Sequence, residues 1–148
     1  MDLSIIVPCF NTDVDVVKEC LQSIENAKIE CKYEVIIIND GSTNVALNEY
    51  LKNYNNKRVR IITKENSGVS ASRNLGMKES CGKFILLLDS DDVLLDNINS
   101  TIKFLDNNPE YDLVYSDTEY FGASEYYYKK GHFSIFRLVY ISNFCFIF

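Results

Sequence analysis

Tryptophan is absent from this chain of 148 residues, and proline and glycine are scarce, with two and six residues. This scarcity excludes collagen-like, linker-rich and disordered chains, because those classes are rich in glycine or proline. A surplus of basic residues is also missing, since the formal net charge is −6 and the isoelectric point is near 4.8. Nucleic acids and anionic membrane surfaces attract clustered lysine and arginine, so we expect neither as a non-specific partner.

The cysteines are odd in number and widely spaced, without any C-x-x-C pair. This pattern indicates neither a disulfide framework nor a zinc site. We expect free thiols in a reducing compartment. The first residues also lack the basic segment of a signal peptide, which favours a cytoplasmic location. The five cysteines are Cys9, Cys20, Cys31, Cys81 and Cys145.

Short β-branched or apolar runs alternate with segments of helical spacing, a pattern typical of right-handed βαβ units. A capping box of Thr12 and Asp15 is expected to begin the first helix, and Gly82 to follow the third helix at its C′ position. The sequence thus predicts an α/β fold with a Rossmann-like, mainly parallel sheet flanked by helices. Strands are expected at 3–7, 33–38, 59–63, 84–88 and 113–116, and further helices at 45–54, 70–81 and 98–105.

The end of the chain, residues 133–148, is mostly apolar, with Arg137 as its only charge. It is shorter than the ~20 residues of a membrane span, and it would favour aggregation if exposed. It inserts into the sheet, or it contacts a partner or the inner face of a membrane peripherally, or the chain is the front part of a longer one. We favour truncation. His132, the only histidine, has no neighbours in sequence that mark a ligand or base, and we expect a structural role.

Ligands of open α/β sheets bind outside the carboxyl ends of the strands. The acidic cluster Asp89, Asp91 and Asp92 directly follows the most apolar strand. Two carboxylates ~4 Å apart repel by roughly 4 kcal/mol at an effective dielectric constant of 20. Solvent can relieve this repulsion at a structural turn, and so can a divalent cation such as Mg²⁺ or Mn²⁺. The spacing alone leaves both interpretations open.

Three other residues at the same edge have two interpretations each. Asp40 could accept a hydrogen bond from a base edge or close its strand with an Asx-turn. Arg73 could pair with a phosphate or lie on the surface. Gly68 allows close backbone approach at a helix N-terminus, a weak signal by itself. The G-x-G-x-x-G, P-loop and G-x-S-x-G motifs do not occur in the sequence.

Four blocks, taken together and in order, resemble the family 2 glycosyltransferases of the GT-A fold. They are LSIIVPCFN at 3–11, EVIIINDGST at 34–43, ENSGVSASRNLG at 65–76 and GKFILLLDSDD at 82–92. The resemblance covers residues 1 to about 120. It implies a nucleotide-sugar-binding domain at 1–120 and the truncated start of an acceptor-binding region at 121–148.

The resemblance also implies roles for particular residues. Asp40 would read uracil or an equivalent base, and Arg73 would contact the nucleotide side of the donor. Asp91, together with Asp89, would bind Mn²⁺ or Mg²⁺ at the family's D-x-D motif. The implied nucleotide-sugar-binding residues are Pro8, Phe10, Asn11, Asp40, Arg73, Asp89 and Ser90.

The implied reaction is inverting, cation-assisted transfer of a sugar from a nucleoside-diphosphate donor, with UDP favoured, to a glycan or lipid-linked acceptor. The general base is expected in the acceptor half, beyond the end of the chain, and Asp117 and Glu119 are the acids left near the right edge. One alternative is a non-catalytic module that only binds nucleotide sugars. Another is a phosphotransferase of the haloacid dehalogenase type, with Asp89 as nucleophile and Asp91 as acid and base.

Overall fold

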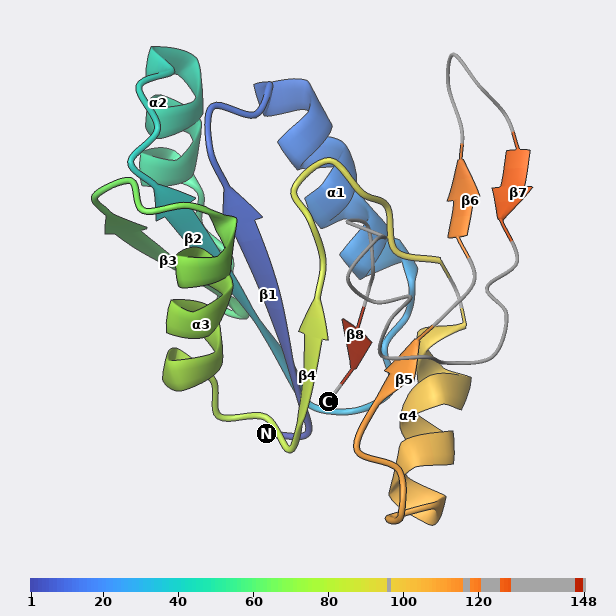
Figure 1. Ribbon diagram of the computed structural model, residues 1–148. Helices are drawn as coiled ribbons and strands as arrows, with labels where there is room; N and C mark the ends of the chain where they lie inside the picture. Colours follow the sequence, from blue (N-terminus) through green and yellow to red (C-terminus); the bar gives the residue numbers. More distant parts are fainter. Residues whose placement is uncertain (96, 116–117, 121–125, 129–145, 148) are drawn as a thin grey trace.

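A computed structural model describes residues 1–95, 97–115, 118–120, 126–128 and 146–147. Its main sheet has the strand order β3-β2-β1-β4-β8-β5, and β6 and β7 form a separate two-stranded sheet (Figure 1). The strands are β1 Leu3–Cys9, β2 Tyr33–Asp40, β3 Val59–Lys64, β4 Phe84–Leu87, β5 Val114–Tyr115, β6 Thr118–Tyr120, β7 Tyr126–Tyr128 and β8 Phe146–Ile147.

The four strands β1 to β4 are parallel, which confirms the predicted α/β architecture. β1 lies between β2 and β4, and every one of its residues is buried. Its run of β-branched and apolar residues is the pattern of a strand covered on both faces. β4 ends one residue earlier than expected, although the Leu88 N–H still donates to the Ile6 carbonyl oxygen at 3.0 Å.

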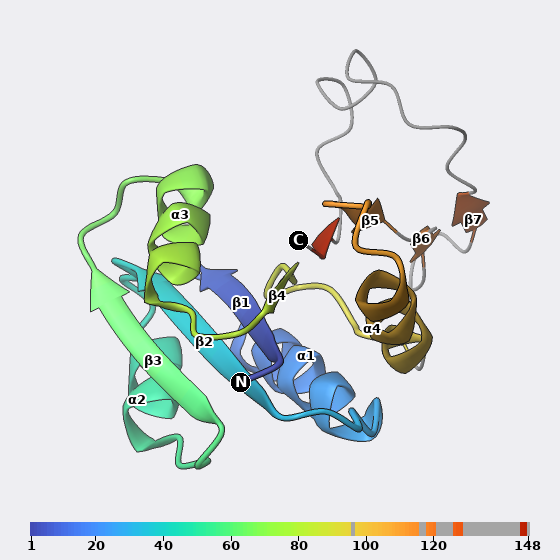
Figure 2. The same cartoon turned by 90° about the horizontal axis from the view of Figure 1, so that it is seen from below.

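The helices cover both faces of this sheet, with α1 and α2 on one face and α3 on the other (Figure 2). Side chains of β1 alternate between the faces, as the period of a strand requires. Ile5 and Val7 join the larger core with α1, α2 and α4, whereas Ile6 joins the smaller core with α3. The helices are α1 Val14–Asn26, α2 Val45–Asn53, α3 Val69–Glu79 and α4 Ile98–Asn107.

Two predicted helix ends are wrong. α1 is capped by Asp13, whose carboxylate accepts from the Asp15 N–H at 2.8 Å, and not by a capping box at Thr12. α3 ends at Glu79 with Ser80 as its C-cap, so Gly82 lies beyond the C′ position. Gly82 is needed for a different reason: a Cβ there would lie 2.5 Å from the backbone nitrogen of Ser4.

α3 lies close against the sheet because Gly76 has no side chain. A Cβ at this position would meet Cγ2 of Ile6 at 2.3 Å, well inside van der Waals contact. The glycine therefore sets how closely α3, which carries Arg73, approaches β1.

Beyond β4 the sheet becomes antiparallel. β8 lies between β4 and β5, so Phe146–Ile147 is inserted into the sheet, one of the alternatives for the apolar tail. β5 covers only two of the four residues expected at 113–116, of which 116 is not described. His132, Cys145, Asp117 and Arg137 lie outside the described residues, and the boundary near 120 stays a prediction. Among the described helices, none is long and apolar enough to cross a bilayer.

Candidate functional site

The chain order creates a switch point between β1 and β4. From β1 the chain proceeds to β2 and β3 on one side, and it then returns to place β4 on the other side. Ligands of open α/β sheets bind at such points, outside the carboxyl ends of the strands. Here a hydrogen bond crosses the switch point: the hydroxyl oxygens of Thr12, after β1, and Ser90, after β4, lie 2.8 Å apart.

The sequence did not predict this hydrogen-bond partner for Ser90. Ser90 is 5% exposed, and its hydroxyl faces Thr12 rather than solvent. Beneath it the Cys20 thiol donates to the Asp89 carbonyl oxygen at 3.6 Å. The turn that carries the acidic cluster is thus fixed from two sides, by α1 and by the β1–α1 loop.

Asp89 and Arg73 form an ion pair across the site. Nη2 of Arg73 donates to Oδ1 of Asp89 at 2.5 Å, and the side chains are 22% and 23% exposed. At this exposure both side chains are accessible to solvent and to a ligand. Arg73 is therefore not a free surface arginine.

One donor of Arg73 is left over. Its Nε atom is buried and has no hydrogen-bond partner within the described part of the chain. A buried N–H without an acceptor costs about 1–3 kcal/mol, so such a group calls for an explanation. An anionic oxygen of a bound ligand would satisfy it.

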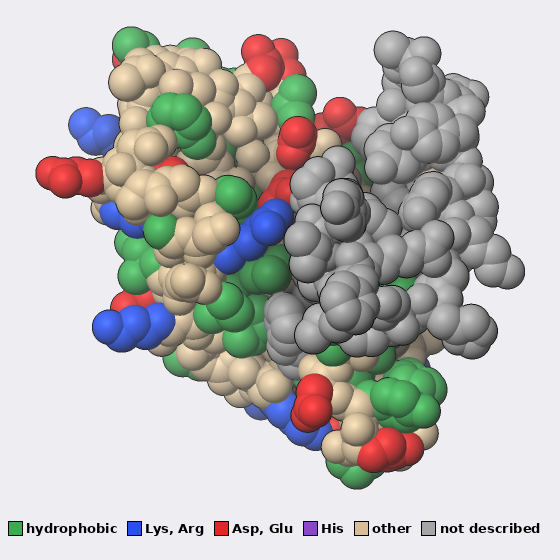
Figure 3. Space-filling model, in the orientation of Figure 1, with side chains coloured by type: hydrophobic (Ala, Val, Ile, Leu, Met, Phe, Trp, Pro, Cys, Tyr) green, Lys and Arg blue, Asp and Glu red, His purple; other side chains and the backbone are tan. Residues whose placement is uncertain are grey.

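Asp91 and Asp92 are exposed, whereas Asp89 is half-buried. Figure 3 shows acidic side chains gathered over α1 and the loop after β4. Burial, together with the neighbouring charges of Asp92 and Asp91, raises the pKa of the Cys20 thiol to about 12. The carboxylates of Asp91 and Asp92 thus lie near enough to the Cys20 thiol to raise its pKa, and they make the end of β4 strongly negative.

The protein's donor set fits a hard divalent cation only in part. Within the described residues no three His, Cys, Asp or Glu side chains are grouped so that they could hold a metal ion. Mg²⁺ is usually held by one or two carboxylates together with substrate phosphates, a number that the D-x-D pair can supply. The residues present therefore fit a cation that arrives with a phosphorylated ligand.

Asp40 lies at the end of β2 and is only 3% exposed. Its carboxylate accepts hydrogen bonds from the N–H groups of Ser67 and Gly68, each at 2.9 Å, and from the Lys64 ammonium. Burial raises the pKa of Asp40, but these three donors outweigh it and leave the pKa below its ordinary value. The turn after β2 is closed by Asn39 instead, whose side-chain oxygen accepts from the Ser42 N–H at 3.1 Å.

A carboxylate offers about four lone-pair sites, and Asp40 uses three of them. A base N–H would take the remaining site or displace one of the present donors. Asp40 meanwhile holds the loop that leads into α3, whose N-cap is Gly68 with φ +90°.

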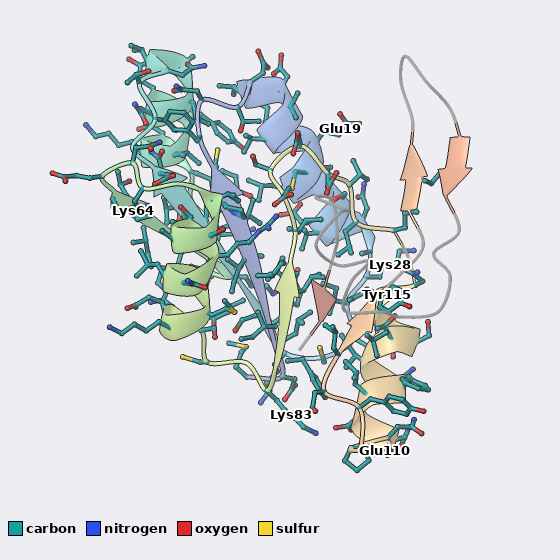
Figure 4. The ribbon with its side chains drawn as sticks, in the orientation of Figure 1. Glu19, Lys28, Lys64, Lys83, Glu110 and Tyr115 are labelled. Carbon is teal, nitrogen blue, oxygen red and sulfur yellow. The ribbon has the colours of Figure 1, made fainter. Side chains whose placement is uncertain are left out.

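Lys64 is the residue that sequence reasoning missed. Its ammonium contacts the Asp40 carboxylate, the Ser67 hydroxyl at 2.5 Å and the Glu65 carbonyl oxygen at 3.2 Å. Figure 4 places Lys64 at the upper end of β3. The pairing register of β2 and β3 could have indicated this contact, because Asp40 and Lys64 are the last residues of these neighbouring parallel strands and lie opposite each other.

The three residues expected on β1 and its loop differ in what they offer a ligand. Pro8 is buried within β1, whereas Phe10 is 50% exposed and presents its ring to solvent. Asn11 has the left-handed φ of +52° and bonds to the loop after β2. Asn11 thus joins the loops after β1 and β2, and Phe10 is the exposed aromatic side chain of the three.

Comparison with known proteins agrees with this arrangement. A family model described as glycosyl transferase family 2 matches residues 4–146. An uncharacterized glycosyltransferase of Rickettsia bellii is 37% identical over 120 residues, which are 80% of this chain and 16% of the relative. A poly(ribitol-phosphate) beta-glucosyltransferase of Bacillus spizizenii is 38% identical over 98 residues, or 64% of this chain and 15% of the relative.

Solved structures support the fold. S. aureus TarS 1–349 in complex with UDP-GlcNAc superposes with a TM-score of 0.64 at 29% identity, covering 76% of this chain and 33% of TarS 1–349. The sheet and its flanking helices therefore define an α/β domain of the GT-A type. The chain belongs to glycosyltransferase family 2. It spans less than a quarter of the length of these Rickettsia and Bacillus relatives. The family assignment removes the haloacid dehalogenase alternative.

Proposed function

We propose that this chain binds the nucleoside-diphosphate part of a sugar donor, with UDP favoured, for transfer of the sugar to a glycan or lipid-linked acceptor. The observation that carries the proposal is the Arg73–Asp89 pair at the switch point, beside the buried Nε of Arg73, which has no hydrogen-bond partner among the described residues. TarS, which superposes on this chain, is bound to UDP-GlcNAc in one structure and to UDP in another. The first observation favours an anionic ligand at the end of β4, and the second favours a nucleoside diphosphate as that ligand.

We further propose that Asp91, supported by Asp89, holds Mn²⁺ or Mg²⁺. Asp91 is the exposed carboxylate of the pair, while Asp89 already shares its charge with Arg73. A bound cation would supply Lewis-acid stabilisation of the leaving diphosphate. The chain's net charge of −6 favours such compensation, because an acidic protein repels an anionic donor at long range.

The remaining residues would position the donor. Arg73 donates hydrogen bonds and orients Asp89, and Asp40 offers its remaining acceptor site to an imide N–H of the base. The half-exposed ring of Phe10 offers an apolar surface against which a base can stack. The acceptor hydroxyl needs a general base, a role that we assign to neither Asp117 nor Glu119.

The proposal is tested by calorimetric titration of UDP into the chain, first with Mn²⁺ and then with EDTA. We expect binding that EDTA weakens at least tenfold. In Asp91→Asn we expect the Mn²⁺ and EDTA affinities to become equal. The control is Asp106→Asn, which removes an exposed carboxylate paired with Lys83 at the other end of the strands and should behave as wild type (Figure 4).

Folded protein that ignores UDP under both conditions would refute the uridine assignment. Incubation with UDP-sugars then separates an enzyme from a binding module. Release of UDP with hydrolysis or transfer favours the enzyme, and binding without turnover favours the non-catalytic alternative.

A further inference from the structure

The loop after β1 is tied to the loop after β2 through one side chain. Oδ1 of Asn11 accepts from the Thr43 N–H at 2.7 Å, the Asn44 N–H at 3.0 Å and the Thr43 hydroxyl at 3.3 Å. In return the Asn11 N–H donates to the Ser42 hydroxyl at 3.0 Å. Four hydrogen bonds thus join residues more than 30 positions apart in the sequence.

The backbone of Asn11 is as specific as its side chain. Its φ of +52° lies in the left-handed region, which asparagine and glycine tolerate better than other residues. This conformation turns the chain out of β1, with the exposed ring of Phe10 on one side and Thr12, bonded to Ser90, on the other. A change in the turn would therefore move both flanking residues.

The other end of the connection is also fixed. Asn44 is the N-cap of α2 and accepts from the Leu47 N–H at 3.1 Å, and the Asn48 side chain donates to the Ser42 carbonyl oxygen at 2.8 Å. Since this loop begins directly after Asp40, Asn11 links the exposed ring of Phe10 to the carboxylate proposed to read the base.

We propose that Asn11 is a positioning residue of the nucleotide site, which sets the placement of Phe10 relative to Asp40 without itself contacting the nucleotide. This inference rests on the proposed function. It replaces the direct contact implied by the resemblance, because the carboxamide oxygen of Asn11 is used within the protein.

Three substitutions separate positioning from direct contact. Asn11→Asp keeps an oxygen that accepts from the same three donors, and its negative charge is favourable at the N-terminus of α2. Asn11→Gly keeps access to the positive φ but removes the acceptor, and Asn11→Ala removes both. A direct contact through the side-chain NH₂ would instead be lost in all three, and most severely in the aspartate, which would repel a diphosphate.

The experiment is UDP titration of the four 148-residue proteins, with hydrogen exchange of the Thr43 and Asn44 amides and thermal melting beside it. We expect Asn11→Asp to bind UDP within about threefold of wild type, and Asn11→Gly and Asn11→Ala to bind at least tenfold more weakly. The two amides should exchange faster in the glycine and alanine variants and stay protected in the aspartate variant. If the alanine variant does not fold, the glycine and aspartate variants suffice for the test.

A failure of the positioning role and a failure of the proposed function give different UDP affinities. If wild type binds UDP and Asn11→Asp loses it as severely as Asn11→Ala, the positioning role is overturned and a direct contact takes its place. Unchanged UDP affinity in Asn11→Gly would overturn it as well. If wild type itself does not bind UDP, the proposed function fails first.

Discussion

The buried carboxylate of Asp40 is the group whose loss we expect to affect this domain most. Asparagine has the same shape, so Asp40→Asn creates no cavity. However, the substitution replaces one acceptor oxygen with an NH₂ group. This NH₂ group then faces one of the N–H donors that the carboxylate of Asp40 accepts from. The substitution also leaves the Lys64 ammonium, 17% exposed, without its counter-charge.

The expected magnitude follows from these contacts. A buried N–H without an acceptor costs about 1–3 kcal/mol, and removing one partner of a buried ion pair costs roughly 3–5 kcal/mol. These two costs arise from the same contacts and do not add in full, and Lys64 is partly exposed, so we expect Asp40→Asn to lower the free energy of unfolding by about 3 kcal/mol. With a urea m-value of about 1–3 kcal/mol/M, the unfolding midpoint should fall by roughly 1–3 M.

The matched control is Asp106→Asn, the same substitution in an ion pair whose side chains, Lys83 and Asp106, are 61% and 60% exposed. We expect it to lower the free energy of unfolding by less than ~1 kcal/mol, as is usual for a surface pair. Urea unfolding of both variants and wild type at pH 7 gives the comparison. A loss in Asp40→Asn no larger than in Asp106→Asn would refute the assignment of Asp40 as a buried acceptor of three donors.

The pH dependence provides a second check on the same carboxylate. Its pKa is lower in the folded protein than the ordinary 3.8, so the ionised form stabilises the fold above that pH. This contribution is lost as the pH falls below 3.8 and through the folded pKa. The difference in stability between wild type and Asp40→Asn should therefore be full at pH 7 and shrink in acid. A difference that stays constant down to pH 3 would contradict the argument.

Two further predictions concern packing and thiol chemistry. Gly76→Ala should lower the free energy of unfolding by about 1–2 kcal/mol, because overpacking against Ile6 exceeds the gain in helix propensity; unchanged or raised stability in urea would contradict the close approach. Iodoacetamide at pH 8 should label the exposed Cys81 quickly and the buried Cys20 slowly, because burial raises the pKa of the Cys20 thiol to about 12. Peptide mass spectrometry over time measures both rates, and equal rates would show that Cys20 is accessible.

Local pattern was enough to predict the order of the helices and strands from β1 to β5, but not the strands β6, β7 and β8. The β-branched runs of β1 and β2 predict buried strands, and the apolar spacing of α1 predicts its buried face, because these signals depend only on neighbours in the chain. The polar segments after the strands predict one binding edge, since parallel strands all end on the same side. The free state of the four described cysteines was predicted from their number and spacing.

Sequence alone determined which polar segments follow the strands, and only the tertiary structure decided with which partners their residues bond. Thr12 was expected to cap a helix, but Ser90, 78 positions away, engages its hydroxyl, and Asp13 caps the helix instead. Lys64 reaches Asp40 through the register of two strands. Such pairings follow from packing between distant segments, which local spacing does not encode, and they distinguish a residue that holds the site together from one exposed to bind a ligand.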